Sequence, residues 1–252
     1  MKSKTNQETV FETSIAPECI KAINSQRILF AHMSVGEDIL SGLALENSKL
    51  QEPIVVRKIE ATSQINTQNT GISQIKIGAN DQPTQKIANF RRFLFSNNNG
   101  KSFDLVGLKF CFVDITNKTD IHALLNEYNA LVKNVKERYP HIKFVHFTVP
   151  LTTRYESLMG RIKKLVLGDQ DNIRRNSYNE LLCETYKNQS IIDIAKIESS
   201  YPDGSRMQHS YFETIHYSLI PAYTTDGGHL NDLGKKRVVA PFVEGLCKAL
   251  SN

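Results

Sequence analysis

The chain lacks the patterns that mark several large classes of protein. None of its 252 residues belongs to an apolar run approaching the roughly 18–20 residues of a membrane span. The polar start of the chain, residues 1–14, has no apolar core of the kind found in a signal peptide. We therefore expect no membrane span and, for the sequence as given, a cytoplasmic protein; an export signal that had been removed would leave no trace here.

Cysteine is scarce and widely spaced. The four cysteines, Cys19, Cys111, Cys183 and Cys247, form no CxxC pair and no metal-ligand spacing. Cys111 falls in an apolar strand pattern and Cys247 in an apolar helical pattern, which predicts a buried thiol at both positions. A disulfide framework is not expected in a chain of this size, and no metal site is expected either.

Motifs for cofactors and nucleic acids are absent as well. The sequence contains neither G-x-G-x-x-G nor a P-loop lysine pattern, so we expect no cofactor. Lys and Arg number 31 against 26 Asp and Glu, which gives a mild net charge of +5. The densest basic stretch, residues 160–175, carries no recognised nucleic-acid motif, so we interpret it as a solvated face and expect no nucleic-acid partner. The sequence does not indicate an oligomeric state.

What is present is an alternation of apolar, strand-like runs with longer helical patterns. The strand-like runs are residues 26–32, 52–61, 103–115, 141–150 and 190–197. The helical patterns cover residues 36–49, 120–139 and 231–252, with Pro241 expected to kink or restart the last. Strands that alternate with helices predict βαβ units and the α/β class, here a three-layer domain around a mainly parallel, five-stranded sheet.

The expected domain organisation follows from this alternation. We expect residues 1–25 to be an N-terminal extension and residues 26–252 to form a single α/β domain. Residues 62–100 are polar and residues 151–189 are helical and charged, so both are expected to be long insertions of the kind that often supply a ligand site. For the basic side chains of the second insertion, a lid for anionic substrates is one hypothesis and a solvated surface is the preferred one: Arg154, Arg161, Lys163, Lys164, Arg174 and Arg175.

Ser34 stands where the first predicted strand gives way to a helix, in the stretch ILFAHMSVGEDIL. In parallel α/β sheets, binding and catalytic sites gather at this kind of position. Backbone N–H groups at the start of the helix would be unpaired and available to a developing anion, and Gly36 permits a close approach. Ser34 is therefore a candidate nucleophile. The alternative is a helix N-cap, a role in which serine is among the best residues, and the two roles are compatible.

A nucleophilic serine needs a base, and His229 is the best candidate. It lies in YTTDGGHLNDLGKKR, three residues after Asp226 and directly before a helical pattern. Asp226 could accept the imidazole Nδ1–H and leave Nε2 free as a general base. The alternative is a simple turn, because Asp-Gly-Gly is strong turn chemistry, with Asn231 or Asp232 capping the helix.

The blocks HMSVG and DGGHLN resemble the first and last sequence blocks of the SGNH/GDSL hydrolases. The resemblance implies a flavodoxin-like, three-layer α/β/α fold over residues 28–250. It assigns the nucleophile to Ser34, the base to His229 and the orienting acid to Asp226. KFCFVDI, HFTVPLT and YTTDGGHLN also resemble uncharacterised bacterial members that carry an H-x-S-V-G block.

Two positions depart from the family pattern. His32 stands two residues before the serine, where the family has glycine; it either hydrogen-bonds within the site or simply ends the strand. The family takes oxyanion donors from the serine, a glycine after the second strand and an asparagine after the third, yet Asp114 follows the third predicted strand here and cannot donate unless it is protonated. The sequence GAND suggests Asn80 as the donor, with Gly71 or Gly78 supplying an amide, or else it is only a turn.

The leading functional hypothesis is a serine esterase or deacylase that forms an acyl-enzyme on Ser34. The polar residues 62–100 favour a carbohydrate or small-molecule ester, such as an O-acetyl group, over a long fatty chain. One alternative is an O-acyltransferase that uses the same residues. Another is a non-catalytic carbohydrate-binding or scaffold protein, motivated by the departure in the third block.

Overall fold

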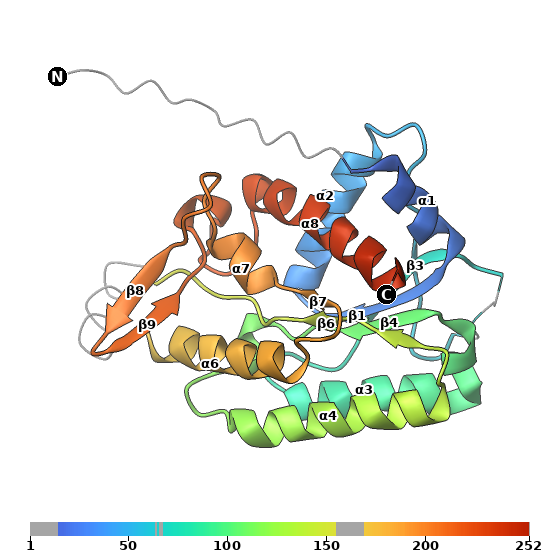
Figure 1. Cartoon of the computed structure of the whole chain (residues 1–252), viewed down its shortest axis with the longest axis horizontal. Coiled ribbons are helices and arrows are strands. Elements are labelled where there is room, and N and C mark those ends of the chain that lie inside the picture. Colours follow the sequence, from blue (N-terminus) through green and yellow to red (C-terminus); the bar gives the residue numbers. More distant parts are fainter. Residues whose placement is uncertain (1–14, 64, 66–67, 155–168, 252) are drawn as a thin grey trace.

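The computed structural model describes residues 15–63, 65, 68–154 and 169–251. Its centre is a sheet whose five strands all run parallel, in the order β2-β3-β1-β4-β5 (Figure 1). The five strands are β1 (Arg27–His32), β2 (Val56–Lys58), β3 (Gly71–Lys76), β4 (Leu105–Leu108) and β5 (Lys143–Phe144). The expectation of a mainly parallel, five-stranded sheet is confirmed.

Two further strand pairs extend this arrangement. Only Val145 separates β5 from β6 (His146–Phe147), and β6 pairs in parallel with β7 (Ile191–Ile192). The extended segment therefore continues the strand order away from β4. The strands β8 (Gln208–Tyr211) and β9 (Thr214–Tyr217) form a separate antiparallel hairpin that projects from one end of the sheet (Figure 1).

Helices cover both faces of the sheet and complete the three layers (Figure 1). One face carries α1 (Pro17–Ser25), α2 (Val35–Asn47), α7 (Ile194–Ser199) and α8 (Asp232–Ser251). The other face carries α3 (Pro83–Phe95), α4 (Ile121–Arg138) and α6 (Gln170–Thr185). Short 3₁₀ helices occur at Ser96–Ser102, Phe112–Asp114 and Pro221–Tyr223. The three-layer α/β/α expectation is confirmed, and α8 runs through Pro241 without a break.

The strand β3 is the main element that the sequence pattern does not reveal. It lies in residues 62–100, which we expected to be a polar insertion, yet it pairs with β1 on one side and β2 on the other. Its sequence GISQIK places Ser73 and Gln74 at buried positions, so no continuous apolar run marks it. Gln74 is satisfied by a hydrogen bond to the His32 ring, 2.9 Å away, and such a partner is not visible in the sequence.

Two predicted strands are shorter than expected. The strand β4 ends at Leu108, and the rest of 103–115 forms a loop that contains the 3₁₀ turn Phe112–Asp114. The strand β7 ends at Ile192 because the Asp193 side chain accepts a hydrogen bond from the Lys196 N–H at 3.0 Å and begins α7. Among the described residues, no helix combines the length and apolar character needed to cross a membrane.

The prediction of a buried thiol at Cys247 is wrong. Cys19 on α1 and Cys247 on α8 form a disulfide with a Cα–Cα distance of 5.2 Å. The two helices pack against each other, and this tertiary contact brings together cysteines that are 228 residues apart. Cys111 is a buried free thiol, as expected, and Cys183 is free and partly exposed. The helix α1 falls within the expected N-terminal extension, and its Ile20 and Ile23 are part of the core.

Candidate active site

Ser34 lies between the end of β1 and the start of α2, in an unusual backbone conformation. Its φ is 52° and its ψ is −110°, a region that non-glycine residues rarely occupy. It stands at the N-cap position, but its side chain makes no capping hydrogen bond. The Oγ lies instead 2.6 Å from His229 Nε2, although 195 residues separate the two in the chain. The side chain is thus available to an imidazole rather than to the helix.

The imidazole of His229 links Ser34 to Asp226. Its Nδ1 lies 2.6 Å from Asp226 Oδ2, within direct hydrogen-bond distance. A carboxylate can only accept, so Nδ1 donates to Asp226 and the bare Nε2 accepts from the Ser34 hydroxyl. The side chains of His229 and Asp226 are 47% and 54% exposed, which leaves the relay open at the surface.

Asp226 is shaped by its turn as well as by the imidazole. Its Oδ1 accepts the backbone N–H groups of Gly228 at 2.9 Å and His229 at 2.8 Å. Partial burial acts to raise the pKa of Asp226, but these hydrogen bonds and the imidazole hold that pKa well below its usual range. The turn and the Asp–His pair, which the sequence leaves as alternatives, occur together in one residue.

Neighbouring segments fix the loop that carries Asp226 and His229. The Thr153 N–H donates to the Gly227 carbonyl at 2.8 Å, and the Gly227 N–H donates to Thr224 Oγ1 at 3.0 Å. Asn231 Oδ1 accepts the Gly234 N–H at 3.0 Å and caps α8. Both ends of the loop are therefore anchored close to His229.

The turn GAND directly follows β3, at the edge of the sheet where β1 ends. The register pairs His32 with Lys76, so Gly78 and Asn80 lie beyond the carboxyl end of β3, beside the segment that leads to Ser34. Gly78 has φ +71°, and a Cβ there would lie 2.6 Å from Lys86 Cγ, so only glycine fits. Asn80 is exposed at this rim.

Asp114 anchors the GAND turn instead of facing an oxyanion. It is fully buried and accepts hydrogen bonds from Lys86 Nζ at 2.5 Å, Asp81 N at 3.0 Å and Cys111 N at 2.7 Å. Lys86 Nζ also lies 3.5 Å from Asn80 Oδ1. A buried ion pair thus joins the end of β4 to the turn after β3, and no pattern in the sequence indicated Lys86 as its cation.

Gly71 does not reach this rim, and that prediction is wrong. It pairs with Arg27 at the opposite end of β1, and its N–H donates to the Gln26 carbonyl at 2.7 Å. His32 is buried, and its Nε2 bonds to Gln74 Oε1 at 2.9 Å; burial lowers the pKa of His32 to about 4 and keeps the ring neutral. A Cβ at Gly36 would lie 2.4 Å from His32 Cβ. His32 therefore supports the start of α2 and is shielded from substrate.

Phe112 and Arg175 are neighbours of the relay that the sequence did not single out for it. The Phe112 ring lies 5.4 Å from the His229 ring, edge to face, and a Cβ at Gly228 would lie 2.6 Å from it. Arg175 Nε donates to the carbonyls of Phe112 at 2.8 Å and Ile115 at 3.1 Å. Arg175 is buried, so its assignment to a solvated face is wrong. Arg161, Lys163 and Lys164 lie outside the described residues.

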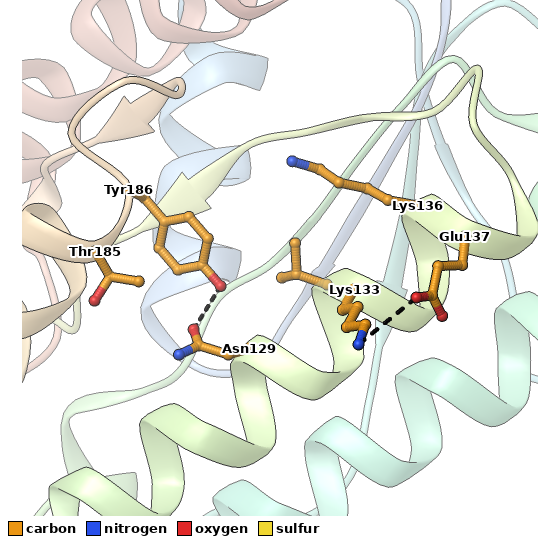
Figure 2. Close-up of a pocket in the computed structure, with 7 residues that line it drawn as sticks. Asn129, Lys133, Lys136, Glu137, Thr185 and Tyr186 are labelled. Atoms are coloured by element: carbon orange, nitrogen blue, oxygen red, sulfur yellow. Dashed lines mark hydrogen bonds and ion pairs between the residues drawn. The ribbon is translucent and has the colours of Figure 1, made fainter.

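A groove of about 580 Å³ lies elsewhere, between α4 and the end of α6 (Figure 2). Its labelled side chains include the hydrogen-bonded pair Tyr186–Asn129, at 2.6 Å, and the ion pair Lys133–Glu137, at 3.8 Å. It contains no member of the Ser34–His229–Asp226 relay. Within the described part of the chain, no group of three or more His, Cys, Asp or Glu side chains is arranged to hold a metal ion.

Comparisons with known proteins identify the fold. No family model matches the chain, and no curated protein matches it in sequence. A Bacteroides fragilis protein assigned as an acylhydrolase has a TM-score of 0.53 at 17% identity, covering 90% of this chain and 89% of its own. A GDSL-like lipase from Parabacteroides merdae has a TM-score of 0.51 at 15% identity, covering 86% and 94%. A lipase/acylhydrolase from Enterococcus faecalis has a TM-score of 0.50 at 11% identity, covering 88% and 96%.

At these identities the likeness concerns the fold, and it agrees with the sequence blocks around Ser34 and His229. The chain has the fold of the SGNH/GDSL hydrolases.

Proposed function

We propose that this protein is a serine hydrolase acting on ester bonds. The observation that carries the proposal is the continuous relay in which Ser34 Oγ lies 2.6 Å from His229 Nε2 and His229 Nδ1 lies 2.6 Å from Asp226 Oδ2. The side-chain order matches what nucleophilic catalysis requires: a hydroxyl, a base in reach of it and a carboxylate that orients the base. The names of the structural neighbours, acylhydrolase and GDSL-like lipase, agree with this chemistry.

The proposed first half-reaction acylates Ser34. As Ser34 Oγ attacks the ester carbonyl carbon, its proton passes to His229 Nε2, and the Asp226 carboxylate stabilises the imidazolium. The carbonyl oxygen becomes an oxyanion, for which we propose the N–H groups of Ser34 and Gly78 and the side-chain amide of Asn80 as donors. Collapse breaks the bond to the alcohol oxygen, which takes the proton from His229 and leaves.

The second half-reaction releases the acid. His229 Nε2 removes a proton from water, which attacks the acyl carbon, and the returning proton regenerates the Ser34 hydroxyl. Acyl transfer to another hydroxyl would follow the same steps with an alcohol in place of water. The half-exposed His229 and Asp226 side chains favour hydrolysis, because transfer requires that water be kept from the acyl-enzyme.

We propose an O-acetyl ester of a carbohydrate or small molecule as the substrate class. Asn80 and the hydroxyl and carboxylate groups of the relay make the rim polar. A polar, open rim fits a hydroxylated substrate with a small acyl group better than a long fatty chain, which needs an apolar channel to leave water.

The experiment is hydrolysis of a chromogenic acetyl ester, with labelling by a fluorophosphonate as a second readout. We expect Ser34→Ala to lose both turnover and labelling while its thermal unfolding stays close to that of the parent. Ser48→Ala, at the exposed end of the same helix, is the matched control and should retain both. Turnover and labelling that persist in Ser34→Ala would contradict the proposal; a parent protein that is never labelled would favour a binding or scaffold role.

A further inference from the structure

Asp38 connects the helix after Ser34 to the loop that carries His229. It lies one turn along α2 from Ser34, and its side chain is half-buried. Its Oδ2 accepts a hydrogen bond from the Leu230 N–H at 3.1 Å, across 192 residues of sequence. Leu230 directly follows His229, and its side chain is buried. The two segments that meet at the relay are therefore joined a second time, immediately beside it.

This second contact has a property that the first lacks. The contact between Ser34 and His229 must break and re-form in every cycle, because Ser34 Oγ becomes bonded to the acyl group and His229 then binds a water or an alcohol. It therefore cannot hold the two segments in register throughout turnover. The bond between Asp38 and the Leu230 N–H involves no reacting atom and persists through every step.

We propose that Asp38 is a positioning residue for the reaction: by holding the Leu230 amide on α2 it sets the reach of His229 to Ser34, and its negative charge stabilises the imidazolium that forms at His229. This inference rests on the proposed function, since it supposes that His229 takes up a proton during turnover. It adds to Asp226, which contacts Nδ1 directly, a second carboxylate on the opposite segment.

The charges around Asp38 are consistent with this role. Burial raises the pKa of Asp38, while the Leu230 N–H and the charges of His229, Lys235 and Lys109 lower it. Because an electrostatic interaction is mutual, a cation on His229 favours the Asp38 carboxylate, and the carboxylate favours that cation equally. Lys235 and Lys109 oppose the cation on His229, so Asp38 also offsets their effect at the rim.

Glu37 provides a matched control. It occupies the same first turn of α2 and would interact equally with the helix dipole, but it is exposed and pairs with Lys76 at 2.7 Å instead of reaching the loop. A purely structural contribution of a first-turn carboxylate to α2 would therefore appear in Glu37→Gln as well as in the Asp38 variants.

The experiment compares Asp38→Ala, Asp38→Asn and Glu37→Gln. Asp38→Ala removes the acceptor and the charge; we expect kcat to fall roughly tenfold with little change in KM, since one hydrogen bond is lost away from the substrate. Hydrogen exchange of the Leu230 amide should accelerate by about the same factor. Asp38→Asn keeps an acceptor, so it should recover most of kcat and of the amide protection, while the acid limb of its pH–rate profile moves to lower pH. Glu37→Gln should match the parent in all three measurements.

The proposal is overturned if Asp38→Ala keeps the parental kcat and Leu230 exchange, or if Glu37→Gln reproduces the changes. An Asp38→Ala chain too unstable to assay leaves the decision with Asp38→Asn, whose unmoved acid limb would refute the electrostatic role. Amide exchange needs no turnover, so it separates the two proposals. A protein without esterase activity in which Asp38→Ala still releases the Leu230 amide would refute the proposed function and support the clamp.

Discussion

Asp226 holds His229 twice: its Oδ1 accepts the His229 backbone N–H at 2.8 Å, and its Oδ2 faces the ring Nδ1 at 2.6 Å. One carboxylate therefore fixes both where the residue starts and which way its imidazole turns. With Nδ1–H engaged, the tautomer that leaves Nε2 bare toward Ser34 is favoured.

Replacing this carboxylate by an amide tests the tautomer directly. In Asp226→Asn the amide can donate to Nδ1, which would place the ring proton on Nε2 and block proton uptake from Ser34. We expect kcat for ester hydrolysis to fall roughly 10³- to 10⁴-fold with little loss of fold. Asp232→Asn, on the highly exposed side chain in the first turn of α8, is the control and should leave kcat unchanged. Equal activity in the two variants would rule out an orienting role for Asp226.

Asn80 is the proposed side-chain donor to the oxyanion. Because it is exposed, its removal should barely affect folding. We expect Asn80→Ala to lower kcat by roughly 10²-fold, the size of effect that a single oxyanion donor has in other hydrolases, while KM changes little. Asn188→Ala removes an exposed amide from the turn after α6 and serves as the control. Steady-state kinetics that do not distinguish the two variants would restrict GAND to a turn.

The disulfide between Cys19 and Cys247 should contribute to stability. Reduction, or Cys19→Ser, is expected to lower the free energy of unfolding by roughly 2–4 kcal/mol, because the cross-link restricts the unfolded chain. Chemical denaturation with and without a thiol reductant measures the difference. Cys183→Ser changes a thiol outside the bridge, so its midpoint should still respond to reductant as the parent does. A parent midpoint that ignores reductant would mean that the bridge does not form in solution.

Glu198 should make stability depend on pH. Burial raises the pKa of Glu198 from 4.5 to about 8, against the opposing effects of the Leu151 N–H, Lys109 and Arg175. The folded state therefore holds this proton more tightly than the unfolded state. The resulting stabilisation is full below pH 4.5 and is lost as pH rises to about 8.

The measurement for Glu198 is urea unfolding across that interval. Glu198→Gln retains an acceptor for the Leu151 N–H but has no proton to lose, so its stability should fall less with pH than that of the parent. The exposed Glu184→Gln should follow the parental curve. Parallel curves for the parent and Glu198→Gln would show that Glu198 titrates alike in both states.

The parts of the molecule that the sequence predicted share a local signal. The strand β1 is apolar throughout, and both Ser34 and the Asp226–His229 turn adjoin a helical pattern. Their meeting at one rim follows from the α/β class, because parallel strands end at the same edge of the sheet. Local pattern and fold class together were therefore enough to predict the relay.

The parts that the sequence did not reveal depend on partners distant in the chain. The strand β3 has polar residues at buried positions, satisfied by β1 and by His32. Lys86 reads as a surface cation until Asp114 is placed beside it. In each case a polar side chain is buried because a remote group compensates it, and hydrophobic patterning carries no record of that compensation.

The bridge from α1 to α8 also changes the topology of the molecule, because it closes 228 residues of sequence separation into a ring. A protease that cuts one exposed connection inside the ring, such as the turn at Phe212, would open the ring without releasing a fragment. The nicked molecule would migrate as a single species until its thiols were reduced, and only then separate into two pieces.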